Sequence, residues 1–177
     1  PYPIGLCDFV GVPERVIAEN GGVAFVDDEM RYLGDRDAAD AVVTAYREAG
    51  HDLGWGDVDL VNRWRETEIA VNRDRPLAPL EAAAAAHGLE VVDTGFAYHV
   101  KSPAMSKGRA LEWAAATLDL DPASFVAVGD SANDASTFAV AGRSFAVANA
   151  DDTAKDAADV VTDGSYAAGF LEAVDSL

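Results

Sequence analysis

A short acidic string after an apolar run is the clearest chemical signal in the sequence. Residues 126–134 read Val-Ala-Val-Gly-Asp-Ser-Ala-Asn-Asp. Ligands of open parallel sheets bind beyond the carboxyl ends of the strands, which is where Asp130 would emerge. Asp134 falls in the first turn of the next helix, so both carboxylates can converge on one hard cation. Mg²⁺ prefers carboxylate oxygens, waters and substrate phosphate, so the string predicts a magnesium site, with Asn133 in a supporting role.

The competing interpretation of this string is structural. Asp and Asn favour helix starts in any protein, and the chain contains 21 Asp residues. The coincidence of an apolar strand, a glycine at 129 and a four-residue spacing between carboxylates favours the metal site.

Lys107 is the second residue whose position suggests chemistry. It falls in the first turn of a predicted helix, where the helix dipole disfavours a cation. A bound anion would remove that conflict, because helix N-terminal N–H groups and an ammonium together bind phosphate. The chain has only three lysines, so the placement is notable. A solvated surface lysine is the alternative.

Arg63 and Arg65 bracket Trp64 in the middle of the chain. Two guanidiniums beside an aromatic ring can bind the carboxylate or phosphate of a substrate. The alternative is a turn whose arginines pair with the nearby Glu66 and Glu68. His99, on a predicted strand, is expected to be a packed or hydrogen-bonded residue rather than a catalytic one.

The last part of the chain alternates helices with fully apolar strands, which predicts a parallel sheet with helical crossovers. Helices are expected at 106–118, 133–140, 152–158 and 166–174, and strands at 125–128, 144–147 and 160–161. Ser106 is the expected N-cap of the first helix.

The first part of the chain has a different pattern. A hairpin is expected from strands at 23–26 and 30–33. Between residues 34 and 102 the pattern predicts a helix with Asp35 as N-cap, strands at 58–61 and 66–71, a helix at 76–86, and strands at 89–92 and 96–100. Such a unit is compatible with a small open sheet covered by two helices.

Composition excludes several classes of function. The formal charge of −18 repels nucleic acid and anionic membranes. No stretch approaches the roughly 20 apolar residues needed to span a bilayer, and one cysteine permits no internal disulfide, so a cytoplasmic enzyme is expected. Asp outnumbers Glu 21 to 10, which resembles the composition of proteins from extreme halophiles.

These residues together resemble the haloacid dehalogenase superfamily of phosphatases, and within it the archaeal phosphoglycolate phosphatases. The string 129–134 looks like the fourth motif of that superfamily, and Lys107 looks like the lysine of its third motif. Glu-Asn-Gly-Gly at 19–22 is similar to the loop before the cap domain, and Asn-Arg-Trp-Arg-Glu at 62–66 resembles a string in the cap. The resemblance implies a Rossmann-type α/β core with an inserted α+β cap: residues 1–33 as core, 34–102 as cap and 103–177 as core.

The sequence departs from the superfamily at its start. The first motif, Asp-x-Asp-Gly-Thr, and the Ser or Thr of the second motif do not occur in it. We therefore expect that the core is incomplete at its N-terminus by about fifty residues, judged from the size of a strand-helix-strand unit. A missing central strand would leave apolar edges unpaired, so we expect the isolated chain to be destabilised and inactive.

The resemblance also implies a mechanism. An aspartate of the missing first motif would attack the phosphoryl group and form an aspartyl-phosphate, which water then hydrolyses. Asp130 and Asp134 would hold Mg²⁺, Lys107 would offset phosphate charge, and Arg63 or Arg65 would hold the carboxylate of 2-phosphoglycolate.

Two other functions remain open from the sequence. One is a phosphatase of the same superfamily acting on a sugar phosphate or another small phosphomonoester. The other is a non-catalytic module that binds metal or phosphate. The expected partner is a small phosphorylated substrate, without nucleic acid or membrane, and a homodimer is among the assemblies that the sequence allows.

Overall fold

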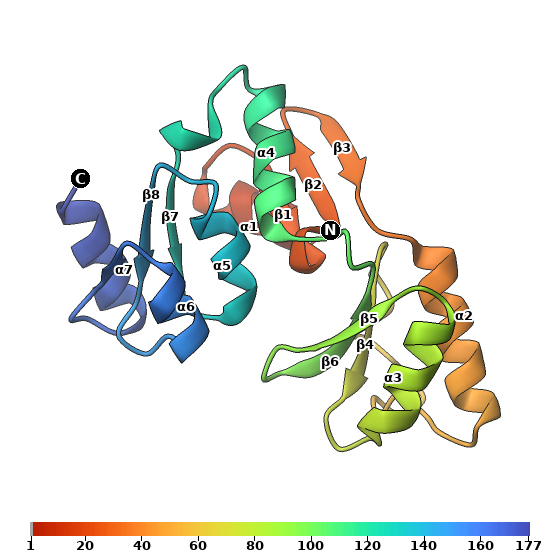
Figure 1. Ribbon diagram of the computed structural model, residues 1–177. Helices are drawn as coiled ribbons and strands as arrows, with labels where there is room; N and C mark the ends of the chain where they lie inside the picture. The colour runs from red at the N-terminus through yellow and green to blue at the C-terminus, as the bar shows by residue number, and fades with distance from the viewer. Residues whose placement is uncertain (1) are drawn as a thin grey trace. The chain divides into compact units, whose positions relative to one another are not determined.

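The computed structural model describes residues 2–177, which form two compact units, Pro1–Met105 and Ser106–Leu177 (Figure 1). The first unit begins with helix α1 (Tyr2–Val10) and a three-stranded antiparallel sheet of β1 (Arg15–Ala18), β2 (Val23–Val26) and β3 (Glu29–Tyr32). The predicted hairpin is confirmed as β2 and β3. Its two-residue turn has φ values of 49° at Asp27 and 70° at Asp28, the left-handed conformation that suits the twist of a hairpin. The sequence patterns did not predict α1 and β1.

A second sheet in the first unit is covered by helices on one face. Strands β4 (Ile69–Asn72), β5 (Glu90–Asp93) and β6 (Ala97–Lys101) pair antiparallel in the order β4-β6-β5. Helices α2 (Arg36–Glu48) and α3 (Leu77–Ala86) lie together against this sheet (Figure 1). The core between them is apolar because each helix turns one stripe inward. Its buried members include Val42, Tyr46, Leu80, Val71 and Val100.

One predicted strand of this unit is wrong. Residues 58–61 form turns, and the strand expected at 66–71 begins only at Ile69. The side chain of Asn62 explains the difference, because its amide accepts a hydrogen bond from the backbone N–H of Ala70 at 2.7 Å and donates one to the Ala70 carbonyl at 2.9 Å. It thereby satisfies the edge of β4 that a neighbouring strand would otherwise pair with. The order is therefore helix-strand-helix-strand-strand.

The second unit has the parallel sheet that its alternating pattern predicted. Strands β7 (Val126–Gly129), β8 (Arg143–Ala146) and β9 (Val160–Val161) pair in that order. Helices α4 (Lys107–Thr117), α5 (Ala135–Phe138), α6 (Asp152–Ala157) and α7 (Tyr166–Asp175) alternate with them. Short 3₁₀ turns cover Glu19–Gly21 in the first unit, and Pro122–Ser124 and Ala132–Asp134 in the second. The core of the second unit is built from Ala127, Phe138, Ala146, Val147, Ala150 and Ala154.

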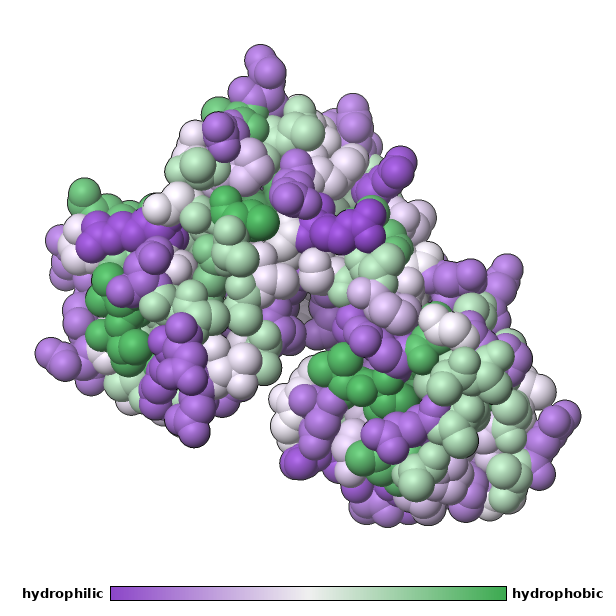
Figure 2. All heavy atoms as spheres, in the orientation of Figure 1, coloured by the Kyte–Doolittle hydropathy of each residue, from purple (hydrophilic) through white to green (hydrophobic). Residues whose placement is uncertain are grey.

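Strand β7 pairs with β8 on one side only, and no strand of residues 2–177 pairs with its other edge. No helix in this described range is long and apolar enough to cross a membrane. Hydrophilic side chains are spread over the visible surface in Figure 2, as the excess of acidic residues leads one to expect.

Candidate active site

Three of the predicted site residues meet at the carboxyl end of β7. Lys107 is the first residue of α4. Ser106 is the N-cap of this helix, and its side chain accepts a hydrogen bond from the N–H of Arg109. The Lys107 ammonium donates to Asp134 Oδ1 at 2.6 Å and to Asn133 Oδ1 at 2.8 Å. Lys107 therefore contacts the acidic string directly, although it lies 26 residues before Asn133 in the sequence. It is not a solvated surface lysine.

Asp134 organises the loop that follows β7. Its second carboxylate oxygen accepts hydrogen bonds from the backbone N–H groups of Asp130 at 3.0 Å and Ser131 at 3.1 Å. The Asp134 side chain is only 13% exposed. Both of its oxygens therefore have donors, and the residue fixes the loop and the ammonium of Lys107 in one arrangement.

Asp130 differs from Asp134 in its surroundings. It lies directly after β7, is exposed, and its carboxylate has no hydrogen-bond partner among residues 2–177. Of the two carboxylates predicted to converge on a metal, Asp130 has no protein partner among residues 2–177, whereas Asp134 accepts hydrogen bonds from Lys107 and from its own loop. Within the described range no group of three or more His, Cys, Asp and Glu side chains could hold a metal ion. A single free carboxylate still fits Mg²⁺, which keeps several waters and binds through one or two carboxylates plus substrate phosphate.

Two close backbone approaches hold this loop in place. A side chain at Gly129 would overlap the Asp134 carboxylate, and one at Gly108 would overlap the carbonyl of Ser136. Gly108 donates its N–H to Ser136 Oγ at 3.1 Å, which joins α4 to α5. The short distance between the two helices is what brings Lys107 to Asp134.

Asp151 also supports the site, and sequence reasoning missed it. One of its carboxylate oxygens accepts from the N–H of Ala132 at 2.7 Å, and the other caps α6 by accepting from Ala154 at 2.8 Å. Its backbone N–H donates to the carbonyl of Asp130 at 3.0 Å. The available signal was its N-cap position before α6, which predicts a structural role but not a contact with the loop.

Arg65 is committed to a buried cluster in the first unit. Its guanidinium forms an ion pair with Glu68, whose side chain is 0% exposed, and its Nε donates to the carbonyl of Val61 at 3.1 Å. Glu68 also contacts His99 Nδ1 at 2.9 Å and accepts from Asn20 Nδ2 at 2.8 Å. The alternative in which Arg65 pairs with Glu68 is therefore the one the structure shows, and His99 has the hydrogen-bonded role expected for it.

These partners change the acidity of Glu68. Burial alone raises the pKa of a carboxyl, but the hydrogen bond and charge of His99, the charge of Arg65 and the Asn20 amide together outweigh it. The pKa of Glu68 is consequently lowered from its usual value of 4.5. The carboxylate is stabilised in its charged form by the residues that surround it.

The Glu-Asn-Gly-Gly loop holds this cluster from the other side. Glu19 and Asn20 adopt φ values of 52° and 53°, uncommon for residues other than glycine. Glu19 accepts from the N–H and hydroxyl of Thr67 at 2.8 and 2.7 Å. A side chain at Gly22 would overlap Thr67. The loop therefore fixes the position of residues 66–68 through its hydrogen bonds.

Arg63 is placed differently from Arg65. Its guanidinium carbon lies 5.6 Å from the centre of the Trp64 ring, and both residues are exposed. Arg63 has no ion pair or hydrogen bond with any of the residues from 2 to 177. It belongs to the first unit, whereas Lys107, Asn133, Asp130 and Asp134 belong to the second.

Comparison with known proteins agrees with this geometry. A family model described as haloacid dehalogenase-like hydrolase matches residues 86–174. The chain is 61% identical over 176 residues to a phosphoglycolate phosphatase of Haloarcula marismortui, covering 98% of this chain and 78% of that protein. It is 59% identical over 177 residues to a phosphoglycolate phosphatase of Halobacterium salinarum, covering 100% and 79%.

Solved structures show the same fold. A Thermoplasma acidophilum protein has a TM-score of 0.72 at 25% identity, covering 92% of this chain and 71% of that one. A haloacid dehalogenase-like hydrolase from Bacteroides thetaiotaomicron has a TM-score of 0.72 at 17% identity, covering 99% and 82%, which supports the fold alone. With the family match over half of its length and close relatives across nearly all of it, the chain belongs to the haloacid dehalogenase-like hydrolases.

Proposed function

We propose that the chain is part of a phosphomonoesterase that hydrolyses 2-phosphoglycolate to glycolate and phosphate. The observation that carries the proposal is the Lys107–Asp134 ion pair of 2.6 Å beside the free carboxylate of Asp130. The identity of about 60% to proteins named phosphoglycolate phosphatase supports the choice of substrate.

In this proposal each site residue has a separate task. The Lys107 ammonium carries three donors, of which two are occupied by Asn133 and Asp134, so one can bind a phosphate oxygen. Asp134 directs that ammonium toward the loop. Asn133 restricts its rotation further. Positioning and electrostatic stabilisation of this kind account for most of the catalysis of phosphoryl transfer.

The metal proposed for the site is Mg²⁺, held directly by Asp130. When bound, Mg²⁺ supplies positive charge to the phosphate oxygens. Both oxygens of Asp134 accept hydrogen bonds from protein donors. We therefore propose that Asp134 contributes to metal binding by fixing the loop geometry, or by accepting a hydrogen bond from a water on the metal. This refines the sequence expectation of two direct carboxylate ligands.

The attacking carboxylate is assigned to a first-motif aspartate that is not among these 177 residues. It would attack the phosphorus of the substrate and form an aspartyl-phosphate, while the P–O bond to glycolate breaks and the glycolate oxygen takes up a proton; water would then hydrolyse the acyl phosphate to phosphate and the free carboxylate. None of the carboxylates among residues 2–177 is proposed as the nucleophile. Activity of this chain would therefore depend on a segment that carries the motif.

Substrate choice is assigned to the unit of residues 34–102, which we propose as a cap, with 1–33 and 103–177 as core. Arg63 and Arg65 are proposed to bind the substrate carboxylate. Arg63 has a free guanidinium, whereas Arg65 can contribute only the donors not used by Glu68 and Val61. We therefore expect Arg63→Gln to raise KM for 2-phosphoglycolate more than KM for a sugar phosphate.

The test is phosphate release by the product of the complete reading frame, assayed at molar salt with and without Mg²⁺. The substrates are 2-phosphoglycolate and a panel of sugar phosphates. Lys107→Gln is compared with Lys155→Gln, a matched change on α6, because the Lys155 ammonium forms no ion pair with the residues from 2 to 177. Mg²⁺-dependent release that favours 2-phosphoglycolate and is lost only in Lys107→Gln supports the proposal.

Other outcomes point elsewhere. Preference for a sugar phosphate would replace the substrate but keep the chemistry. A folded protein that releases no phosphate from any of these substrates would instead indicate a module that binds metal or phosphate without catalysis.

A further inference from the structure

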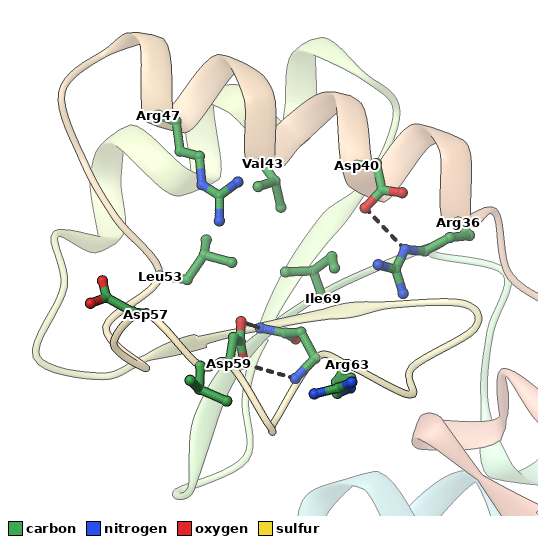
Figure 3. Close-up of a pocket in the computed structure, with 11 residues that line it drawn as sticks. Arg36, Asp40, Val43, Arg47, Leu53, Asp57, Asp59, Arg63 and Ile69 are labelled. Atoms are coloured by element: carbon green, nitrogen blue, oxygen red, sulfur yellow. Dashed lines mark hydrogen bonds and ion pairs between the residues drawn. The ribbon is translucent and has the colours of Figure 1, made fainter. Parts of the chain in front are cut away.

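A cavity of about 520 Å³ lies within the first unit, and none of its lining residues belongs to the acidic string (Figure 3). One wall is a face of α2, on which Arg36, Asp40, Val43 and Arg47 are spaced three or four residues apart. The opposite wall is the segment that carries Asp57, Asp59 and Arg63. The size lies within the range of small-molecule sites.

The floor of this cavity is apolar and buried. Val43 is 8% exposed, Leu53 is 6% exposed and Ile69 is 2% exposed. Figure 3 shows Leu53 and Ile69 between the two polar walls. A ligand that fills the cavity would therefore cover apolar surface and meet charged groups at the rim.

Three of the ten arginines of the chain line this one cavity. Arg36 is already used, because it pairs with Asp40 at 3.0 Å and donates to the carbonyl of Arg65. The guanidiniums of Arg47 and Arg63 have no hydrogen bond or ion pair with any residue from 2 to 177, although that of Arg63 lies 5.6 Å from the centre of the Trp64 ring. Two guanidiniums of this one cavity are therefore without an acidic partner in the described range.

The acidic residues of the cavity do not neutralise these two guanidiniums. Asp40 is bound to Arg36, and Asp59 accepts from the backbone and the amide of Asn62 at 2.9 and 2.6 Å. Only Asp57 has no such partner among the described residues. The three Arg and three Asp side chains of the lining balance in formal charge, but Arg47 and Arg63 form no ion pair with any of these carboxylates among the described residues.

We propose that this cavity binds a small organic oxyanion, a carboxylate or phosphate on a partly apolar body, through Arg47 and Arg63. Guanidiniums present paired donors that match the oxygens of carboxylates and phosphates. Val43, Leu53 and Ile69 would contact the apolar part, and Asp57 would accept a hydrogen bond from a hydroxyl or amine of the ligand. The inference does not depend on the proposed phosphatase activity.

The test uses two-dimensional NMR of the labelled product of the complete reading frame, titrated with phenylphosphonate and, separately, with benzoate. A phosphatase cannot hydrolyse a phosphonate, so the readout does not require activity. Benzyl alcohol is the uncharged control ligand. We expect shifts to concentrate on residues 36–47 and 53–63, with Kd raised about tenfold in Arg47→Gln, as the loss of one charged hydrogen-bonding partner predicts.

Arg31→Gln is the matched control, because Arg31 is exposed on β3 and has no ion pair with the residues described. It should leave Kd unchanged. Arg47 is preferred to Arg63 for the substitution, because Arg63 is also proposed to bind the substrate. If benzoate binds as phenylphosphonate does, the site accepts carboxylates; if only the phosphonate binds, it accepts phosphates.

Three results would overturn the inference. The first is the absence of shifts in residues 36–63 with either anion. The second is a response confined to Lys107 and the acidic string, which would mean that the anions bind the candidate active site only. The third is equal affinity in Arg47→Gln and the unchanged protein, or equal binding of benzyl alcohol.

Discussion

Two carboxylates of this chain occupy opposite environments. Glu68, in the first unit, is fully buried and contacts Arg65, His99 and Asn20. Asp130, in the second unit, is exposed and has no partner for its side chain among residues 2–177. A buried carboxylate must be satisfied by the protein itself, whereas an exposed one at a strand end remains available to a ligand. The surroundings of an acidic residue are therefore a better guide to its role than its type.

The largest expected effect is on the stability of the first unit. Glu68→Gln removes the charge that holds Arg65 and His99 in a buried site, and loss of one partner of a buried ion pair costs about 3 kcal/mol or more. Urea unfolding measures this cost. Glu66→Gln, a neighbouring exposed residue, is the control and should change the unfolding free energy by less than about 0.5 kcal/mol. Equal effects at 66 and 68 would show that the cluster does not stabilise the fold.

The next effect should fall on activity alone. Asp130→Asn removes the free carboxylate proposed to hold Mg²⁺, and we expect kcat/KM to fall about a hundredfold, or about 2.7 kcal/mol. Because the Asp130 side chain has no protein partner in the range described, unfolding in urea should be unchanged. Asp156→Asn on α6 is the control. If Asp130→Asn lowered stability but not activity, Asp130 would have the stabilising role assigned to Glu68 rather than a role in metal binding.

A smaller effect concerns pH. The pKa of Glu68 is lowered in the folded state, so its contribution to stability is complete above its unfolded value of 4.5 and is lost as pH falls through the folded value. The stability difference between the unchanged protein and Glu68→Gln should therefore shrink below about pH 4.5. Urea unfolding at a series of pH values would detect this change. A difference that grows on acidification would contradict the assigned direction.

The smallest effects should be nearly equal in the two units. Asp35 and Ser106 cap α2 and α4, accepting from Ala38 at 2.9 Å and from Arg109 at 3.2 Å. Replacing either by Ala should cost about 1 kcal/mol of stability. Only Ser106→Ala should also reduce activity, because α4 carries Lys107. An equal loss of activity in Asp35→Ala would show that the cap of α2 affects activity as much as the cap of α4 does.

Local signals account for what the sequence could predict. Caps, glycines and apolar periodicity predicted α2, α3, the β2–β3 hairpin and the alternating second unit, and all are confirmed. The grouping of Lys107 with the acidic string followed from the family resemblance, which assigns both to one phosphate site. No sequence pattern indicated that Asp134 would also accept hydrogen bonds from the N–H groups of its own loop.

Long-range contacts explain what the sequence could not predict. Glu68 lies 31 residues from His99 and 48 from Asn20, so no local pattern indicates that it is buried. The turns at 58–61 depend on Asn62 pairing with Ala70, a side-chain contact that mimics a strand. Helix α1 is apolar at most of its positions, so it has no polar face against which periodicity could detect an apolar one.

Among the described residues, the side-chain hydrogen bonds of Lys107, Asp134 and Asp151 at the candidate active site have their partners after Met105. The proposed cap, by contrast, lies before Met105. Under this proposed division of roles, exchange of gene segments that encode the cap would change the substrates of the protein, while selection on its chemistry would act mainly on the segment that follows.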